Sequence, residues 1–338
     1  MNTMKVLYLI GNGFDRNLGL RTSYSDFLSE YVKIPSDNEQ INAFKQYLVE
    51  QKNNGNELWS DLEILLGAST SNFETPTIFE TVLLDVNASL RSYIVKENEK
   101  LVFNNDAHDR FISYLLNPHK YLTNANQRNL SAFVKYYGNT WDIDFMSFNY
   151  TYSVEKLLGD SIGKEIGKNA FGGVTKVNSV KHIHGVCDET ILVGLNDASQ
   201  MVNAKFRDNQ RLIRKFIKPK TNETIGELVD VECQNLIRNA NIICCFGLSF
   251  GKTDSIWWDM IINSLNSDSH RVIVYDYKAD LDITNNKWEL GDGKEEVCNR
   301  IFRNNSHHRL DQILYALNTD MFSGLTPCVK GDTMVAGG

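Results

Sequence analysis

The feature that most limits the fold is a short apolar segment near the N-terminus that stops at two glycines. Residues 5–10 (KVLYLI) are rich in β-forming side chains, and the chain then continues into Gly11-Asn12-Gly13. An apolar run of this length, bounded by glycines, is typical of a buried strand that leads into a tight loop. The segment therefore predicts a buried strand of an α/β fold.

Strand signals return after residue 140 and alternate with helical segments. The apolar runs are residues 143–148, 182–184, 191–193, 242–246 and 272–275. Helical spacing of apolar residues occupies residues 152–158, 201–216, 226–238 and 254–266. Apolar strands that alternate with helices indicate a mostly parallel, Rossmann-like sheet with helices on both faces.

The 338 residues exceed what one α/β core needs. Between about residue 40 and residue 138 the apolar spacing is almost wholly helical. We expect residues 1–35 and 139–320 to form the α/β core, residues 36–138 to form a helical insertion, and residues 321–338 to form a flexible tail.

Charge and cysteine content exclude several classes of protein. The formal charge is −7, which argues against non-specific nucleic-acid binding as the main function. The six cysteines form no CxxC pair and have no zinc-ligand spacing, so we expect free thiols, no metal site and a reducing, cytoplasmic location. No apolar run is long enough to be a signal sequence or a membrane span, and we expect no membrane partner.

Four segments at predicted strand ends carry residues suited to nucleotide chemistry. In the first, Gly11, Asn12, Gly13 and Asp15 lie where backbone N–H groups can approach a phosphate. The alternative is a purely structural turn. In the second, Asn149 follows an apolar strand, where its amide could hold a ribose hydroxyl or a water molecule; it could instead cap the next helix.

The third segment contains two histidines. Strand alternation would place His182 and His184 on the same face, with Ile183 opposite. His184 precedes a glycine at the strand end and is a candidate general base, while a metal pair or hydrogen-bonded structural histidines are the alternatives. In the fourth segment, Gly247 and Ser249 could contact a diphosphate, or could simply connect a strand to a helix capped by Thr253 or Asp254.

Three other features admit two interpretations each. Glu63 lies in the predicted insertion, where an acidic helix face is usually solvated. Trp257 and Trp258 could stack on a ligand or pack in the core. The stretch 205–220 could contact nucleic acid or a phosphate, or pair with the chain's own acids, and contains seven basic residues: Lys205, Arg207, Arg211, Arg214, Lys215, Lys218 and Lys220.

The motifs together resemble a known family. Residues 10–15 (IGNGFD), followed by Gly19-Leu20 and residues 22–27 (TSYSDF), look like the opening signature of the bacterial abortive-infection AbiH family. Residues 59–63 (WSDLE), 148–151 (FNYT), 183–185 (IHG) and 246–249 (FGLS) with Asp254 also resemble it. The resemblance implies a role in defence against phage and a phage-derived trigger.

The order of motifs more distantly resembles sirtuin-like NAD-hydrolysing defence domains. That resemblance implies Asn149 and His184 as catalytic residues, and Gly11, Asn12, Gly13, Asp15, Gly247, Ser249 and Asp254 as nucleotide-binding residues. The chain lacks the four-cysteine zinc module of deacylating sirtuins and has Gly-Asn-Gly in place of Gly-Ala-Gly. The resemblance to these domains implies hydrolysis of NAD+ to ADP-ribose and nicotinamide without a further cofactor.

Two other functions remain open from the sequence. The first is a nucleotide-binding regulator or toxin partner that turns nothing over. The second is an effector that acts on nucleic acid through residues 205–220, although we find no clustered carboxylates for metal-assisted cleavage. A second copy of the chain is a further candidate partner.

Overall fold

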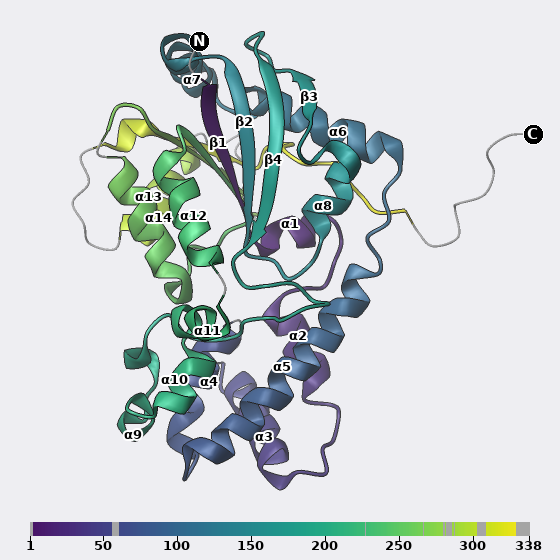
Figure 1. The fold of residues 1–338 in the computed structure, drawn as a ribbon, viewed down its shortest axis with the longest axis vertical. Coiled ribbons are helices and arrows are strands. Elements are labelled where there is room, and N and C mark those ends of the chain that lie inside the picture. Colours follow the sequence, from purple (N-terminus) through teal and green to yellow (C-terminus); the bar gives the residue numbers. More distant parts are fainter. Residues whose placement is uncertain are drawn as a thin grey trace, which may run out of the picture.

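The structure is a computed structural model that describes residues 3–55, 61–226, 228–265, 267–279, 281, 286, 288–302 and 309–328. Figure 1 shows an α/β part built around a sheet and a helical part below it. The described strands are β1 (Thr3–Ile10), β2 (Thr140–Ser147), β3 (Glu165–Lys168), β4 (Val174–His182), β5 (Ile242–Phe246), β6 (Arg271–Asp276) and β7 (Ile313–Leu317).

The sheet confirms the expected α/β class with mostly parallel strands. Its order is β3-β4-β2-β1-β5-β6-β7, and every neighbouring pair is parallel except β3 with β4. The chain leaves β1 toward β2 on one side, whereas the connection from β4 returns past β1 to reach β5. Such a reversal next to β1 creates the kind of sheet edge at which ligands bind in open α/β folds.

Two predicted strands differ in the structure. The run 182–184 is the end of the longer β4, which stops at His182, and within 191–193 only Ile191 forms an isolated bridge. Most of β4 alternates with polar residues, so it shows no apolar run. The sequence analysis also missed β3, which is largely exposed, and β7, whose short apolar run does not distinguish a strand from a helix.

Helices cover both faces of the sheet because β1 alternates its side chains between them. Tyr8 and Ile10 pack with residues of α6 (Asn105–Leu116), α7 (Asn124–Tyr137) and α8 (Ser153–Leu158). Leu7 and Leu9 pack with α12 (Val229–Asn239), α13 (Ser255–Ser264) and α14 (Glu289–Phe302). Trp257 and Trp258 are buried in this second core, which confirms their packing role.

The helical part combines two stretches of the chain (Figure 1). One stretch supplies α2 (Tyr24–Tyr31), α3 (Glu39–Asn53), α4 (Leu62–Ser69) and α5 (Pro76–Asn98), and the other supplies α9 (Ala204–Arg207), α10 (Gln210–Phe216) and α11 (Lys218–Ile225). The apolar residues of α2–α5, α9 and α10 form one continuous core, which also includes Ile217 just before α11. Within the predicted insertion, by contrast, α6 and α7 pack against the sheet rather than in this core.

The predicted flexible tail does not begin at residue 321. Met321, Phe322 and Leu325 are buried, and the Phe322 ring contacts Phe14 and Phe246. The prediction for residues 321–325 is therefore wrong, because three large apolar side chains insert into the sheet core. Residues 329–338 lie outside the described residues.

The strand register aligns the predicted functional segments. Ile10 is paired with Ser147 of β2 and with Phe246 of β5, and Ser147 is paired with His182 of β4. These four strands therefore end at the same level, and their carboxyl ends point toward the helical part (Figure 1). The residues that follow each strand consequently meet at one edge of the sheet.

Candidate functional site

The glycines after β1 and β5 pack directly against each other. The N–H of Gly11 donates to the carbonyl of Phe246 and the N–H of Gly13 donates to the carbonyl of Gly247, each at 2.9 Å. A Cβ on Gly13 would lie 2.5 Å from the Cα of Gly247, and Gly247 itself has a φ of +70°. Close approach of two backbones thus explains the glycines.

This pairing limits which groups of the first loop could contact a phosphate. The N–H groups of Gly11 and Gly13 are already used within the chain, so they are not free to hold a diphosphate. The short helix α1 (Asn12–Asn17) begins immediately after Gly11, and the side chain of Asn12 accepts a hydrogen bond from Thr22 at 2.5 Å. Ser249, in the second loop, is exposed.

Asn149 belongs to a buried group that we call the amide cluster, formed by Asp15, Asn149 and Thr151. The amide nitrogen of Asn149 donates to Asp15 Oδ1 at 3.0 Å and to the carbonyl of Gly11 at 3.1 Å. Thr151 donates to Asp15 Oδ2 at 2.7 Å. The amide oxygen of Asn149 is buried and has no hydrogen-bond partner among the described residues. The hydrogen bonds of the amide nitrogen thus fix the orientation of an amide oxygen that can accept a further hydrogen bond.

Asp15 is buried and bonds to Asn149 and Thr151. Burial raises the pKa of its carboxyl to about 6, although hydrogen bonds from Thr151, Ser153 and Asn149 oppose the shift. The helix cap suggested as an alternative role of Asn149 is absent, because Tyr152 precedes α8 as its first flanking residue.

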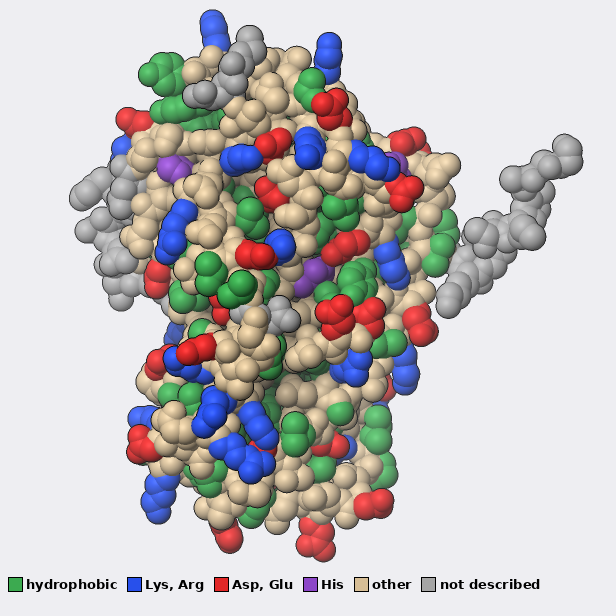
Figure 2. Space-filling view, in the orientation of Figure 1, with side chains coloured by type: hydrophobic (Ala, Val, Ile, Leu, Met, Phe, Trp, Pro, Cys, Tyr) green, Lys and Arg blue, Asp and Glu red, His purple; other side chains and the backbone are tan. Residues whose placement is uncertain are grey.

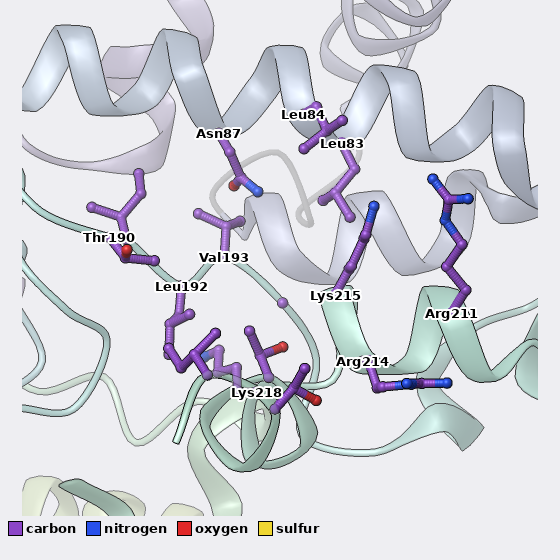
Figure 3. A pocket seen from close by; sticks show the side chains of 15 residues that line it. Leu83, Leu84, Asn87, Thr190, Leu192, Val193, Arg211, Arg214, Lys215 and Lys218 are labelled. Atoms are coloured by element: carbon purple, nitrogen blue, oxygen red, sulfur yellow. The ribbon is translucent and has the colours of Figure 1, made fainter. Parts of the chain in front are cut away.

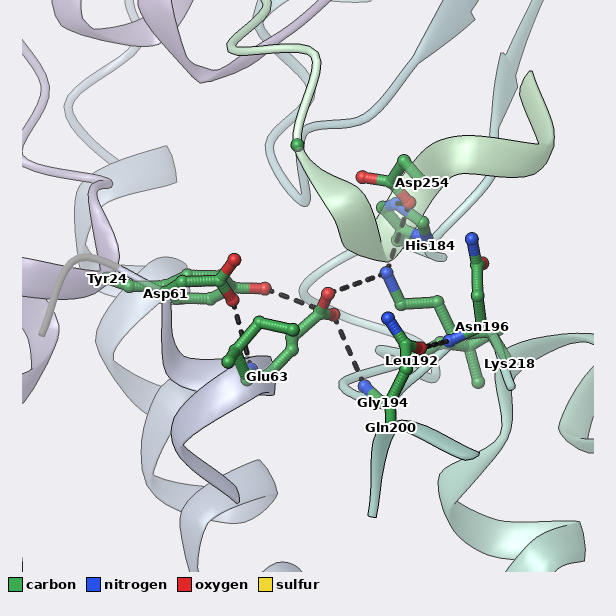
Figure 4. Close-up of polar contacts among 12 residues, drawn as sticks. Tyr24, Asp61, Glu63, His184, Leu192, Gly194, Asn196, Gln200, Lys218 and Asp254 are labelled. Atoms are coloured by element: carbon green, nitrogen blue, oxygen red, sulfur yellow. Dashed lines mark hydrogen bonds and ion pairs between the residues drawn. The ribbon is translucent and has the colours of Figure 1, made fainter. Parts of the chain in front are cut away.

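His184 belongs to a second group of side chains, shown in Figure 4, that we call the ionic network: Glu63, His184, Lys218 and Asp254. Asp254 is partly exposed and the other three are buried. His184 Nε2 is 3.1 Å from Asp254 Oδ1, although the pair does not have the geometry of a hydrogen bond. Lys218 Nζ is 3.2 Å from the same Asp254 oxygen and 2.8 Å from Glu63 Oε2. One ammonium thus joins two carboxylates beside an imidazole.

Burial and charge set the protonation of this network. Burial by itself would lower the pKa of Lys218, but the carboxylates of Asp254 and Glu63 outweigh it and raise that pKa above its usual value. Burial would raise the pKa of Asp254, yet Lys218 and His184 hold it well below its usual range. For Glu63, burial prevails over Lys218, and its pKa is raised. Asp254 is thus the firmly ionised partner of His184.

Two tyrosines connect the network to the segment that contains Asn149. The hydroxyls of Tyr24 and Tyr150 lie 3.0 Å apart, and Tyr24 also donates to Glu63 at 3.4 Å. Tyr150 donates to the carbonyl of Leu192 at 3.2 Å. Burial raises the pKa of both tyrosines, so they remain neutral donors.

The structure brings the predicted catalytic residues near each other. Phe148 and Tyr150, on either side of Asn149, flank the His184 ring with centroid distances of 5.7 and 6.4 Å. Asn149 is only 4% exposed and His184 only 5%, so both lie beneath the surface. A ligand reaches them only if the covering chain moves.

The two histidines do not act as a pair. β4 ends at His182, and His184 lies in the following turn, so strand alternation does not relate them. His182 contacts the carbonyl of Asn149 at 2.9 Å and Glu155 at 2.6 Å, whereas His184 contacts Asp254. The described residues contain no group of three or more His, Cys, Asp or Glu side chains that could hold a metal ion.

The sequence analysis missed the most buried ions of the site. The sequence predicts a solvated helix face for Glu63, but its side chain is buried, with 2% exposure. Lys218 was one of seven basic residues in 205–220, yet it is buried while Lys205, Arg211 and Arg214 are exposed. Its position after the buried pair Phe216-Ile217 was the available signal. Trp59 and Ser60, from the same motif as Glu63, lie outside the described residues.

Comparison with known proteins identifies the family once this geometry is known. The family described as bacteriophage abortive infection AbiH matches residues 7–276, from β1 to the end of β6. The chain belongs to the AbiH family. The match includes both the amide cluster and the ionic network, whereas α14 and β7 lie beyond it. No curated protein matches the chain.

Membership of the AbiH family associates the chain with anti-phage abortive infection. Among the helices that the structure describes, none is long and apolar enough to cross a membrane. Of the six cysteines, all are free and five are buried, in agreement with packing roles.

Proposed function

We propose that this AbiH protein defends against phage by hydrolysing NAD+ to ADP-ribose and nicotinamide. The observation that carries the proposal is the contact of the buried His184 with Asp254, beside Asn149 at the carboxyl edge of the sheet. A histidine next to an ionised carboxylate is suited to accept a proton, because the carboxylate stabilises the imidazolium that forms. The resemblance to sirtuin-like NAD-hydrolysing domains supplies the substrate.

The proposed reaction needs few groups. The bond between ribose C1′ and the nicotinamide nitrogen breaks, and nicotinamide leaves as a neutral molecule with the bonding electrons. Water then forms a bond to C1′ and gives one proton to His184, from which it passes to solvent. The ribose ring passes through an oxocarbenium-like state, as in other glycosidic cleavages.

Asn149 positions the water molecule or a ribose hydroxyl in this proposal. Its amide nitrogen is held by Asp15 and Gly11, which leaves the amide oxygen to accept a hydrogen bond from the substrate or the water. Because Gly11 and Gly13 have paired N–H groups, we assign the phosphate contacts of the proposal to the loop from Gly247 to Ser249.

Burial of the site suggests that it is closed at rest. His184 and Asn149 reach NAD+ only after the covering segments move, which is consistent with an enzyme that acts after infection is sensed. We therefore expect a phage-derived trigger to open the site.

The test follows nicotinamide release. Purified protein is incubated with NAD+ alone and with lysate from phage-infected cells, and the products are separated by chromatography. We expect turnover with infected lysate and a loss of about 10²- to 10⁴-fold in His184→Ala, the range typical of a removed general base. Arg238→Ala, an exposed change on α12, serves as the matched control.

Two outcomes contradict hydrolysis. The first is full activity in His184→Ala. The second is NAD+ that raises the melting temperature of the protein but remains intact under every condition, which indicates instead a nucleotide-binding regulator.

A further inference from the structure

A cavity of about 670 Å³ lies outside the proposed catalytic site, between α5, α10, α11 and the segment 190–194. Figure 3 shows α5 above it and α10 with α11 below it. Neither Asn149 nor His184 lines this cavity. Its volume falls in the range of pockets that hold small-molecule ligands.

The charged side chains that line the cavity are all basic. Arg211 and Lys215 extend from α10 toward α5 (Figure 3), and both pair with the buried carboxylate of Glu80. Arg214 donates through Nε to the carbonyl of Gln210 and forms no ion pair with any described carboxylate. Of the three cations on α10, two share the Glu80 carboxylate and Arg214 pairs with no described carboxylate, so an anion is favoured here.

The rest of the cavity wall combines apolar side chains with Asn87 and three threonines, Thr190, Thr221 and Thr224. Leu83, Ile191, Val193 and Ile225 contribute hydrocarbon surface. Asn87 lies among them, and its amide oxygen is buried without a hydrogen-bond partner among the described residues. A buried acceptor of this kind indicates a ligand that supplies an N–H or O–H donor.

We propose that this cavity binds a nucleoside monophosphate whose base carries an amino group, such as AMP. The phosphate lies against Arg214 and Lys215, the base packs on the leucine and valine side chains, and the amino group donates to Asn87. Phosphate alone would leave the apolar wall and Asn87 without partners, and a nucleoside alone would leave the excess basic charge unmatched.

The site shares one residue with the ionic network. Lys218 lines the cavity while its ammonium contacts Glu63 and Asp254, and the N–H of Leu192, another lining residue, donates to the carbonyl of His184. The cavity therefore adjoins the wall of the proposed catalytic site. Its ligand binding nevertheless does not depend on NAD+ hydrolysis.

Isothermal titration calorimetry tests the proposal with AMP, adenosine and inorganic phosphate as separate probes. We expect AMP to bind more tightly than either fragment. Arg214→Glu should weaken AMP binding by about 10- to 100-fold, as expected for loss of a charge-assisted contact. Leu84→Trp, at an exposed position that lines the cavity, should also block AMP, whereas Arg238→Ala should not change the affinity.

Three results would overturn the proposal. The first is that AMP does not bind to the unmodified protein. The second is that Arg214→Glu and Leu84→Trp bind AMP with the affinity of the unmodified protein. The third is that only Asn149→Ala loses AMP binding, which would place AMP at the sheet edge. An inactive protein that still binds AMP through Arg214 would contradict the proposed hydrolysis but support this site.

Discussion

At the scale of single residues, burial distinguishes the charges that belong to the site from those in solvent. Lys218 and Lys220 are two positions apart at the start of α11, yet Lys218 is buried between Glu63 and Asp254 whereas Lys220 pairs with Glu223 in solvent. The sequence shows both as members of one basic stretch. The apolar pair Phe216-Ile217 before Lys218 is a local signal of burial. The local sequence does not show the ion pairs, however, because the carboxylates that surround Lys218 come from α4 and from the short 3₁₀ helix Lys252–Asp254 after β5.

Removal of the Lys218 charge should strongly destabilise the protein. Lys218→Met leaves the buried Glu63 and the partly exposed Asp254 without their cation, and breaking a buried ion pair costs about 3–5 kcal/mol. Urea denaturation measures the loss, with Lys220→Met as a control that should change stability little because its ion pair is exposed. Equal effects of the two substitutions would show that the network is not a buried one.

Asp15 should make stability depend on pH in a defined direction. Burial raises its pKa to about 6 in the folded protein, whereas an unfolded aspartate titrates near about 4. Between these values the unfolded chain loses the proton first, so the free energy of unfolding falls as pH rises through this window and levels off above it. The folded and unfolded pKa values of Asp15 differ by about 2, so the free energy of unfolding should fall by about 3 kcal/mol across this window.

Asp15→Asn should lack this component. Urea denaturation of both proteins at several values between pH 4 and 7 gives the comparison. We expect the variant to gain stability relative to the unmodified protein as pH rises. Parallel pH profiles would contradict a raised pKa at Asp15.

At the scale of elements, backbone hydrogen bonds join the glycine loops that follow β1 and β5. The sequence correctly predicted both strands and the glycine turns, because local apolar runs and glycine placement determine them. It could not show that Gly11 and Gly13 use their N–H groups on Phe246 and Gly247, which are more than 200 positions away. These two N–H groups are therefore not available for the expected phosphate contact.

Gly13→Ala should disturb this junction. The new Cβ would lie 2.5 Å from the Cα of Gly247, so the backbone must shift, at a cost of about 1–3 kcal/mol for an overpacked site. Gly291→Ala in α14 is the control, since no atom lies within 4 Å of its Cβ and alanine favours a helix. Thermal unfolding should separate the two variants; equal melting temperatures would contradict tight packing of the two loops.

At the scale of the whole molecule, the site lies between the sheet and a helical part assembled from two distant stretches. The α/β class and the helical content before residue 139 could be predicted from periodicity. The joint core of α2–α5 with α9 and α10 could not, because it depends on contacts between segments more than 100 residues apart. The same contacts bring Glu63 and Lys218 to His184.

The proposed activity of this AbiH protein is hydrolysis of NAD+ with His184 as the general base. The most direct measurement is the NAD+ content of phage-infected cells that carry the unmodified protein, His184→Ala or Arg238→Ala, followed by mass spectrometry during infection. We predict that NAD+ falls with the unmodified and Arg238→Ala proteins and persists with His184→Ala, together with loss of protection. Protection from phage with NAD+ unchanged would contradict the claim.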